Sequence, residues 1–331
     1  MGEEVPIIDV SALLTPGGDL ERVGSEIRTA CSRFGFFYIV GHGVPEPLSE
    51  RLEAESRQFF ALSSSEKREI EMERGGRAWR GFFPVGGELT LGRPDQKEGL
   101  YFGEELGPED LRVVAGKPLH GPNLFPVRPV GLREAVWEYM AALTALSHAV
   151  MRGLAVSLGL ESDYFRARYT ADPLVLFRIF HYPPLLSDTA GDGAPQFSVG
   201  EHTDYGLLTI LQQSSAGLEV KVQGEWQSAP PVPGSFVCNL GDMLDRMTSG
   251  FYRSTAHRVR NRTGSSRFSF PFFFDPAFDA EVSPIEVGEG ARRSGDARWD
   301  GIDVHDWSGT YGDYLLDKIG RVFPGLGREV L

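Results

Sequence analysis

The chain has 331 residues, which is enough for one large domain with a full core. Hydrophobic residues make up 41% and charged residues 24%, as in ordinary globular proteins, and no apolar run approaches the roughly 20 residues of a membrane helix. The net charge of −13 disfavours nucleic acid as a partner, and the N-terminus lacks a secretory signal pattern. Two cysteines, Cys31 and Cys238, predict a reduced, cytoplasmic protein without a disulfide framework.

The first half of the chain mixes helices with short strands. Strands are predicted at 5–10 and 34–44, and apolar spacing of three or four predicts helices at 19–33, 47–61, 64–72 and 131–159. Residues 74–103 are rich in Gly, Arg and aromatic side chains and have little helical period. We interpret this segment as an ordered functional loop or a set of hairpins.

The second half changes to short strands separated by turns. They are predicted at 175–183, 208–213, 218–222, 235–240, 257–261 and 267–274, and a helix follows at 309–325. Many short strands at this spacing indicate a β-sandwich or barrel. No Pro- or Ser-rich linker separates the chain into independent domains.

A metal-binding pattern occurs in the segment Glu201-His202-Thr203-Asp204. Side chains alternate along a strand, so His202 and Asp204 would point to the same side. A third ligand must come from elsewhere, and His257 stands at the start of another predicted strand. Two histidines and one carboxylate on one face of a metal are the ligand set of mononuclear non-haem iron(II) oxygenases.

The net charge of such a metal site indicates that an anionic small molecule also binds to it. Iron(II) with one carboxylate keeps a positive charge, so a dianionic 2-oxo acid could chelate it. The far carboxylate of that acid then needs a cation, which Arg267 can supply, and Ser269 on the same strand face can add a hydroxyl. These two residues favour an iron oxygenase with an oxo-acid cosubstrate.

Several segments resemble the isopenicillin N synthase-like family of iron(II)/2-oxoglutarate-dependent oxygenases: HTDYGLLTILQQ, GLEV, NLGDMLDRMTSGFYRSTAHRV and RFSFPFFFDP. VPIIDVS and FGFFYIVGHGVP resemble the family's N-terminal region, and TYGDYLLDKIGRVFP resembles its C-terminal helix. The resemblance spans nearly the whole chain and implies a mainly β fold with flanking helices around a double-stranded β-helix, a cupin-like jelly roll. We expect one catalytic unit over 1–331, with an N-terminal oxygenase region at 5–127, the jelly-roll core at 173–280 and a C-terminal helical segment at 305–331.

The same resemblance implies roles for particular residues. The implied metal ligands are His202, Asp204 and His257, and the implied binding residues for the far carboxylate of 2-oxoglutarate are Arg267, Ser269 and Tyr182. We expect no catalytic residue beyond the metal ligands. Many family members have Asn two residues before the tyrosine, where this chain has Phe180, so that polar contact is not expected. Residues 239–242 are typical of the family and predict a turn that positions the His257 strand.

The implied activity is that of an oxidoreductase, a non-haem dioxygenase that uses Fe(II), 2-oxoglutarate and dioxygen. It would hydroxylate, desaturate or cyclise a small molecule, such as an amino acid or a secondary metabolite, and release succinate and carbon dioxide. We expect neither a membrane nor nucleic acid as a partner.

The substrate is less defined than the reaction. Residues 86–95, GGELTLGRPD, resemble a loop of bacterial ethylene-forming oxygenases in which a Glu and a Thr contact an arginine substrate. The corresponding residues here are Glu88 and Thr90, which makes a basic amino acid a candidate substrate. Tyr205, directly after Asp204, is a third candidate substrate-binding residue. Specificity is expected in the loops 74–103 and 184–200 and in the C-terminal segment.

Three alternatives remain open. The first is an iron(II) oxidase of the isopenicillin N synthase or aminocyclopropane carboxylate oxidase type, which uses no 2-oxoglutarate and binds a substrate carboxylate with the Arg-x-Ser pair. The second is a non-catalytic cupin-like binding protein, which has no need of three intact ligands. The third is a zinc hydrolase, which leaves Arg267 and Ser269 without a role.

Overall fold

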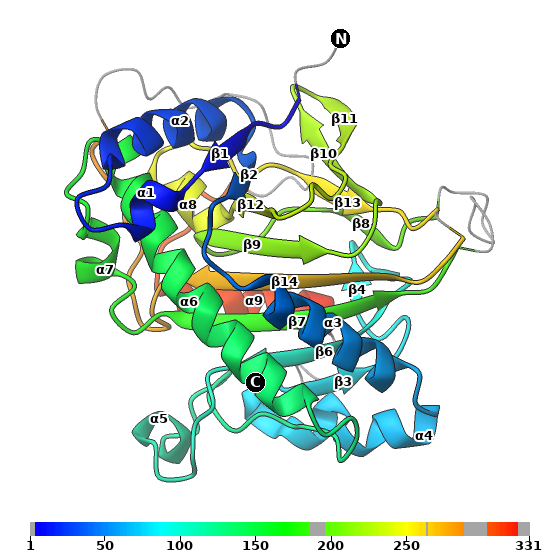
Figure 1. Ribbon diagram of the computed structural model, residues 1–331. Coiled ribbons are helices and arrows are strands. Elements are labelled where there is room, and N and C mark those ends of the chain that lie inside the picture. The colour runs from blue at the N-terminus through cyan, green and yellow to red at the C-terminus, as the bar shows by residue number, and fades with distance from the viewer. Residues whose placement is uncertain (1–3, 186–195, 263, 288–302, 324–331) are drawn as a thin grey trace.

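The computed structural model describes residues 4–185, 196–262, 264–287 and 303–323, and shows two β-sheets with helices packed around them (Figure 1). The larger sheet has the strand order β1 (Ile7–Asp9), β2 (Phe36–Val40), β12 (Phe236–Leu240), β9 (Leu208–Gln213), β14 (Arg267–Asp275), β7 (Leu174–Tyr182), β6 (Glu98–Gly103) and β3 (Gly81–Phe83). The smaller sheet has the order β11 (Glu225–Ser228), β10 (Leu218–Val222), β13 (His257–Val259) and β8 (Val199–His202). A separate hairpin pairs β4 (Leu89–Thr90) with β5 (Arg93–Pro94).

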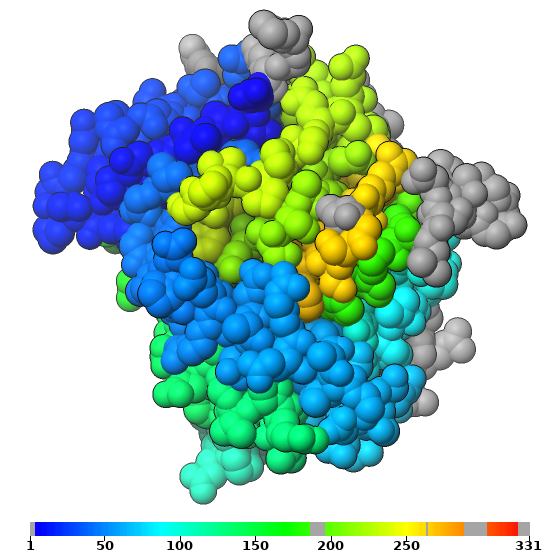
Figure 2. Space-filling model, turned by 45° about the vertical axis from the view of Figure 1, so that its right-hand side comes forward, coloured from blue at the N-terminus to red at the C-terminus, as the bar shows by residue number. Residues whose placement is uncertain are grey.

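Most of the helices pack around the larger sheet. They are α1 (Ser11–Leu14), α2 (Leu20–Arg33), α3 (Glu46–Phe60), α4 (Ser64–Lys67), α5 (Leu111–Val114), α6 (Leu132–Ser157), α7 (Tyr164–Arg168), α8 (Asp242–Met247) and α9 (Tyr311–Val322), with 3₁₀ turns at Arg68–Ile70 and Met72–Ala78. The long α6 packs on α2, α3, β9 and β14. Figure 2 shows the N-terminal part of the chain, in blue, lying directly against the yellow-green and orange strands of the second half.

Helix α6 forms the centre of the packing between helices and sheet. By length and composition it could cross a membrane, but 61% of its most apolar window is buried inside the molecule. Tyr139, Leu143, Val150 and Leu154 are fully buried along one side, as the three- and four-residue spacing predicts. The apolar character of this helix is therefore explained by the core that it fills.

Strand β14 connects this packing to the interior of the jelly roll. It pairs antiparallel with β7 on one side and β9 on the other, and nearly all of its residues are buried. The alternating phenylalanines Phe270, Phe272 and Phe274 are fully buried, while Arg267 and Ser269 lie on the opposite face. The register places Arg267 beside Tyr182 and Ser269 beside Phe180, so the polar groups gather at one end of the strand pair.

The predicted mainly β jelly roll with flanking helices is confirmed, although some elements differ from their predicted form. The helix predicted at 64–72 ends as an α-helix at Lys67 and continues as 3₁₀ turns. The segment 74–103 contains β3, the β4–β5 hairpin and β6, which agrees with a hairpin set. Residues 186–195 of the predicted specificity loop and 324–331 of the C-terminal segment lie outside the described residues.

Candidate metal centre and active-site cavity

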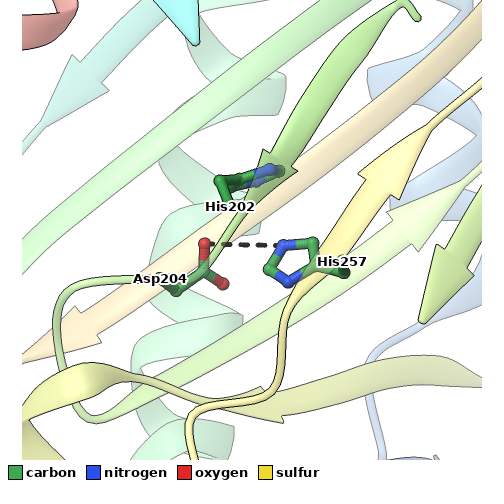
Figure 3. A group of neighbouring side chains, drawn as sticks. All are labelled: His202, Asp204 and His257. Atoms are coloured by element: carbon green, nitrogen blue, oxygen red, sulfur yellow. Dashed lines mark ion pairs between the residues drawn. The ribbon is translucent and has the colours of Figure 1, made fainter. Parts of the chain in front are cut away.

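Two histidines and one aspartate converge where the smaller sheet ends (Figure 3). His202 ends β8, His257 begins β13, and the antiparallel pairing of these strands places the two residues opposite one another. One potential ligand atom from each of His202, Asp204 and His257 lies within 4.8 Å of the others. Two strands that are distant in the sequence therefore bring together the three predicted ligands.

The position of Asp204 differs from the predicted one. Strand β8 ends at His202, so Asp204 lies in the turn that follows and not on the strand. The backbone N–H of Asp242 donates to the Asp204 carbonyl at 2.8 Å, and the side chains of Thr209 and Asn239 both donate to Oδ2 at 2.6 Å. Asn239 and Asp242, from the segment 239–242 that was predicted to position the His257 strand, thus contact Asp204.

The hydrogen bonds behind the cluster leave one ligand atom free on each residue. Nδ1 of His202 lies 2.9 Å from the Gly200 carbonyl, and Nδ1 of His257 lies 3.2 Å from the Thr255 carbonyl. Each carbonyl requires a proton on Nδ1, which leaves the Nε2 lone pair available for a metal. Oδ1 of Asp204 accepts no hydrogen bond from the described residues and lies 3.7 Å from Nε2 of His257.

The protonation states also suit a divalent cation. Burial, together with neighbouring His257, lowers the pKa of His202 to about 3, so its imidazole is neutral at physiological pH. Burial alone would raise the pKa of Asp204, but His257, His202 and the Asn239 and Thr209 donors bring it below its ordinary value. A neutral imidazole and an ionised carboxylate are the forms that coordinate metal.

The three residues predicted to bind the oxo-acid cosubstrate lie together. Arg267 is fully buried, and its Cζ lies 4.9 Å from the centre of the Tyr182 ring. The hydroxyls of Tyr182 and Ser269 are 3.0 Å apart. Arg267 also donates from Nη2 to Gln213 Oε1 at 2.9 Å, while its buried Nη1 has no acceptor among the described residues. An orphaned guanidinium N–H beside two hydroxyls suits a carboxylate.

The metal cluster and Arg267 line one cavity of about 440 Å³. Its other walls come from the β4–β5 hairpin, β6, β7 and α9. Glu88, Thr90 and Tyr205, the predicted substrate-binding residues, all line this cavity. Residues that we did not predict line it as well: Lys97, Tyr101, Arg178 and Leu211, and Leu315, Lys318, Ile319 and Phe323 of α9 or its end.

Glu88 is held by two partners on β6 and just before it. Tyr101 Oη donates to Glu88 Oε1 at 2.8 Å, and Lys97 Nζ lies 2.8 Å from Glu88 Oε2. Lys97 also pairs with Asp95 at 2.6 Å, and the Thr90 hydroxyl donates to the same Asp95 at 3.0 Å. The hydroxyl of Thr90 is therefore engaged within the hairpin. Lys97 Nζ lies 4.7 Å from the centre of the ring of Phe180, the residue that stands where many family members have Asn.

One of these missed residues could have been found from the sequence. Arg178 is two positions before Phe180 and four before Tyr182, so alternation along the predicted strand 175–183 places all three on one face. Lys97 and Tyr101 could not be found in this way, because β6 was not predicted as a strand. The α9 residues belong to the C-terminal segment in which specificity was expected, but no motif marks the individual residues that line the cavity.

Comparisons with known proteins agree with this geometry. Residues 5–128 match the family model described as non-haem dioxygenase in morphine synthesis N-terminal, and residues 165–276 match that of the 2OG-Fe(II) oxygenase superfamily. A probable iron/ascorbate oxidoreductase of Dictyostelium discoideum is 48% identical over 99% of this chain and 97% of its own length. A 1-aminocyclopropane-1-carboxylate oxidase of Dictyostelium mucoroides is 38% identical over 97% of this chain and 96% of its own.

Two further proteins are similar to this chain over nearly its whole length. A homoarginine-6-hydroxylase of Glycine max is 35% identical over 97% of this chain and 98% of its own length. Among solved structures, a full-length protein of Neurospora crassa in complex with alpha-KG and thymine is similar with a TM-score of 0.77 and 26% identity, covering 96% of both chains.

Proposed function

Because this chain belongs to the 2OG-Fe(II) oxygenase superfamily, we propose that it hydroxylates a small amino acid with a cationic side chain, of the homoarginine type. The family uses Fe(II), 2-oxoglutarate and dioxygen. In the proposed reaction one oxygen atom enters the substrate and the other enters succinate, while 2-oxoglutarate loses carbon dioxide. The observation that carries the choice of substrate is the carboxylate of Glu88 in the cavity wall.

His202, Asp204 and His257 would hold the iron, which when bound supplies the activation of dioxygen. The Gly200 and Thr255 carbonyls orient the two imidazoles, and the Asn239 and Thr209 donors fix the carboxylate. These contacts keep the three ligand atoms in place before any metal arrives. Such preorganisation is what a metal site needs if its ligands come from separate strands.

Arg267, Ser269 and Tyr182 would bind the far carboxylate of 2-oxoglutarate. Gln213 and the Ser215 carbonyl hold the Arg267 guanidinium from the side, with the latter accepting from Nε at 3.2 Å. This leaves Nη1 and the two hydroxyls for the carboxylate. A fully buried guanidinium that is held by neutral groups binds an anion far more strongly than an exposed guanidinium does.

The local charge around Glu88 supports a cationic substrate group. Two carboxylates, Glu88 and Asp95, share the single ammonium of Lys97, and all three side chains are largely buried. Burial raises the pKa of Asp95, which eases this excess of negative charge but leaves Glu88 as the acid facing the cavity. A carboxylate has lone pairs for further donors, so a substrate ammonium or guanidinium can bind beside Lys97.

The test is incubation of the purified protein with Fe(II), 2-oxoglutarate and either L-homoarginine or L-norleucine. We expect succinate formation, and a product heavier by one oxygen atom, with L-homoarginine only. The variant Glu88→Gln should form this product more slowly at low L-homoarginine concentration, through a raised KM, whereas Glu225→Gln on the exposed edge strand β11 should behave as the wild type does. Equal turnover of both amino acids would contradict the role of Glu88 in selecting a cation.

A second candidate function is supported by the similarity to a 1-aminocyclopropane-1-carboxylate oxidase. In that case Arg267 and Ser269 would bind the carboxylate of the substrate and no 2-oxoglutarate would be consumed. Oxygen uptake with aminocyclopropane carboxylate and ascorbate, in the absence of 2-oxoglutarate, distinguishes this function from the first.

A further inference from the structure

Arg178 is a cation inside the active-site cavity that forms no ion pair with any other described residue. It lies on β7, on the same face as Phe180 and Tyr182, and lines the cavity. Its Nη1 is buried without an acceptor, and within residues 4–185, 196–262, 264–287 and 303–323 the guanidinium forms neither a hydrogen bond nor an ion pair. A half-buried guanidinium without an acceptor is unfavourable, so this group has a free capacity to bind an anion.

Aromatic rings hold the guanidinium in place without using its donors. The Cζ atom lies 3.4 Å from the centre of the Tyr101 ring and 5.5 Å from that of Phe273. Tyr101 is the partner of Arg178 in the register of β6 and β7, so the strand pairing fixes this stacking. A guanidinium stacked on a ring face keeps its N–H groups pointing outward in its own plane, where an acceptor can reach them.

The neighbouring carboxylates are engaged elsewhere. Glu88 accepts from Tyr101 and pairs with Lys97, and Asp275 accepts from the hydroxyl of Tyr311 on α9. Neither forms an ion pair with Arg178. The cavity therefore contains an anionic group, Glu88, and an unpaired cationic group, Arg178, separated by the side chain of Tyr101.

We propose that Arg178 binds a carboxylate of a molecule held in this cavity. The carboxylate can come from the amino-acid substrate or from the end of 2-oxoglutarate next to its ketone, and the chemistry of recognition is the same for both. The amino-acid substrate as the source of the carboxylate rests on the proposed function. Its side-chain cation would bind Glu88 and its carboxylate would bind Arg178, so the molecule would extend across Tyr101. Arg178 thus selects substrates that carry an acid group, while Glu88 selects their basic end.

The test measures binding by calorimetry under anaerobic conditions with the iron-loaded protein. The probes are L-homoarginine and its amide, L-norleucine and its amide, and 2-oxoglutarate. Each acid and amide pair differs only in the carboxylate, and the norleucine pair tests Arg178 without any cation on the side chain. The variants are Arg178→Gln and Arg178→Lys. The matched control is Arg57→Gln, since Arg57 also stacks on a ring, at 4.5 Å from Phe268, but lies on α3 outside the cavity.

We expect the wild type to prefer an acid over its amide, and Arg178→Gln to weaken binding of that acid by about ten- to a hundredfold without changing binding of the amide. Arg178→Lys should restore part of the loss, and Arg57→Gln should change neither. If Arg178→Gln instead weakens the binding of 2-oxoglutarate alone by the same factor, the cosubstrate is the source of the carboxylate.

Failure of the two proposals would look different. A wild type that binds L-norleucine over its amide but ignores L-homoarginine contradicts the cationic substrate and supports Arg178. No acid preference in the wild type, together with unchanged 2-oxoglutarate binding in Arg178→Gln, would overturn the role of Arg178.

Discussion

The two walls of the active-site cavity are built differently. On the wall formed by β8, β13 and β14, each functional side chain is held from behind by a neutral partner, such as the Gly200 carbonyl for His202 and Asn239 for Asp204. On the wall formed by the β4–β5 hairpin, β6, the Arg178 part of β7 and α9, charged groups pair with one another, as Glu88 does with Lys97, or remain unpaired, as Arg178 does among the described residues. In the proposed function the first wall would hold iron and 2-oxoglutarate, whereas the second would gain its missing partners from a substrate.

The largest effect is expected on the first wall, from His202→Ala. Loss of one of three ligands should abolish iron(II) binding and reduce succinate formation to background, because the remaining His257 and Asp204 cannot fix the metal alone. Iron content after anaerobic reconstitution, measured beside turnover, checks this expectation. His42→Ala, on a histidine outside the cluster, is the control and should bind iron as the wild type does. Full iron binding by His202→Ala would contradict the metal assignment.

Replacement of the buried cation should separate the cosubstrate from the metal. Arg267→Gln should raise the KM for 2-oxoglutarate by about a hundredfold, since the charge-assisted bonds to its far carboxylate are lost. Iron(II) affinity should stay the same, because Arg267 contacts none of the three ligands. An unchanged KM in a folded variant is the result that this account cannot accommodate.

The partner behind Asp204 should have a smaller effect. Asn239→Ala removes one of the two donors to Oδ2 and should weaken iron(II) binding by about ten- to a hundredfold, with turnover recovered at high iron concentration. Asn123→Ala is a matched control, because Asn123 is also buried and hydrogen-bonded but lies outside the cavity lining. Recovery of turnover by added iron distinguishes a positioning role from general loss of structure.

On the second wall, Glu88→Gln should raise the KM for L-homoarginine by about tenfold or more and leave the KM for 2-oxoglutarate unchanged. The amide retains an acceptor for Tyr101 but not the charge that attracts a guanidinium. Steady-state kinetics with each substrate varied in turn separates the two constants. A parallel rise in both would show that the two walls are coupled and that the comparison between them is wrong.

The last effect is on stability and not on turnover, and it concerns the attachment of α9 to the cavity. Burial, with a contribution from Asp204, raises the pKa of Asp275 from 3.8 to about 7, and Tyr311 of α9 donates to this carboxyl. Asp275 is therefore protonated in the folded chain at pH values where it is ionised in the unfolded chain. Its contribution to stability is present below pH 3.8 and is lost as the pH rises toward 7, by on the order of 1 kcal/mol per pH unit.

Urea unfolding of the metal-free protein tests this dependence. The difference in unfolding free energy between the wild type and Asp275→Asn should fall as the pH rises from about 4 to 7, because the amide does not ionise. Asp163→Asn, on an exposed aspartate before α7, is the control variant. A constant difference for Asp275→Asn would mean that this carboxyl is ionised throughout.

The contrast between the two walls also explains which site residues could be predicted from the sequence alone. His202 and Asp204 share a short motif, and Arg267 and Ser269 share a strand face, so local patterns were sufficient to select both pairs as candidates, although Asp204 lies after its strand and not on it. His257 required the fold, because only the pairing of β13 with β8 places it opposite His202. The jelly roll itself followed from the spacing of short strands and the family resemblance.

Specificity was expected in segments 74–103 and 305–331, which contribute to the second wall, but most of its individual residues could not be predicted because its parts meet only in three dimensions. Lys97 lies just before β6, Arg178 lies on β7, and Lys318 lies on α9, and all three line one cavity. A pattern of alternation reveals which residues share a face, but it does not reveal which hairpin or helix covers that face. Glu88 was predicted from a loop resemblance, whereas its partners Lys97 and Tyr101 emerged only from the structure.

The most direct test of the central claim is oxygen uptake by the iron-loaded protein with L-homoarginine, measured with and without 2-oxoglutarate while succinate is assayed in parallel. If the first wall binds iron and 2-oxoglutarate as described, oxygen uptake should require 2-oxoglutarate, and one succinate should form for each dioxygen consumed. Oxygen uptake at the same rate without 2-oxoglutarate would contradict the account and assign Arg267 and Ser269 to a substrate carboxylate.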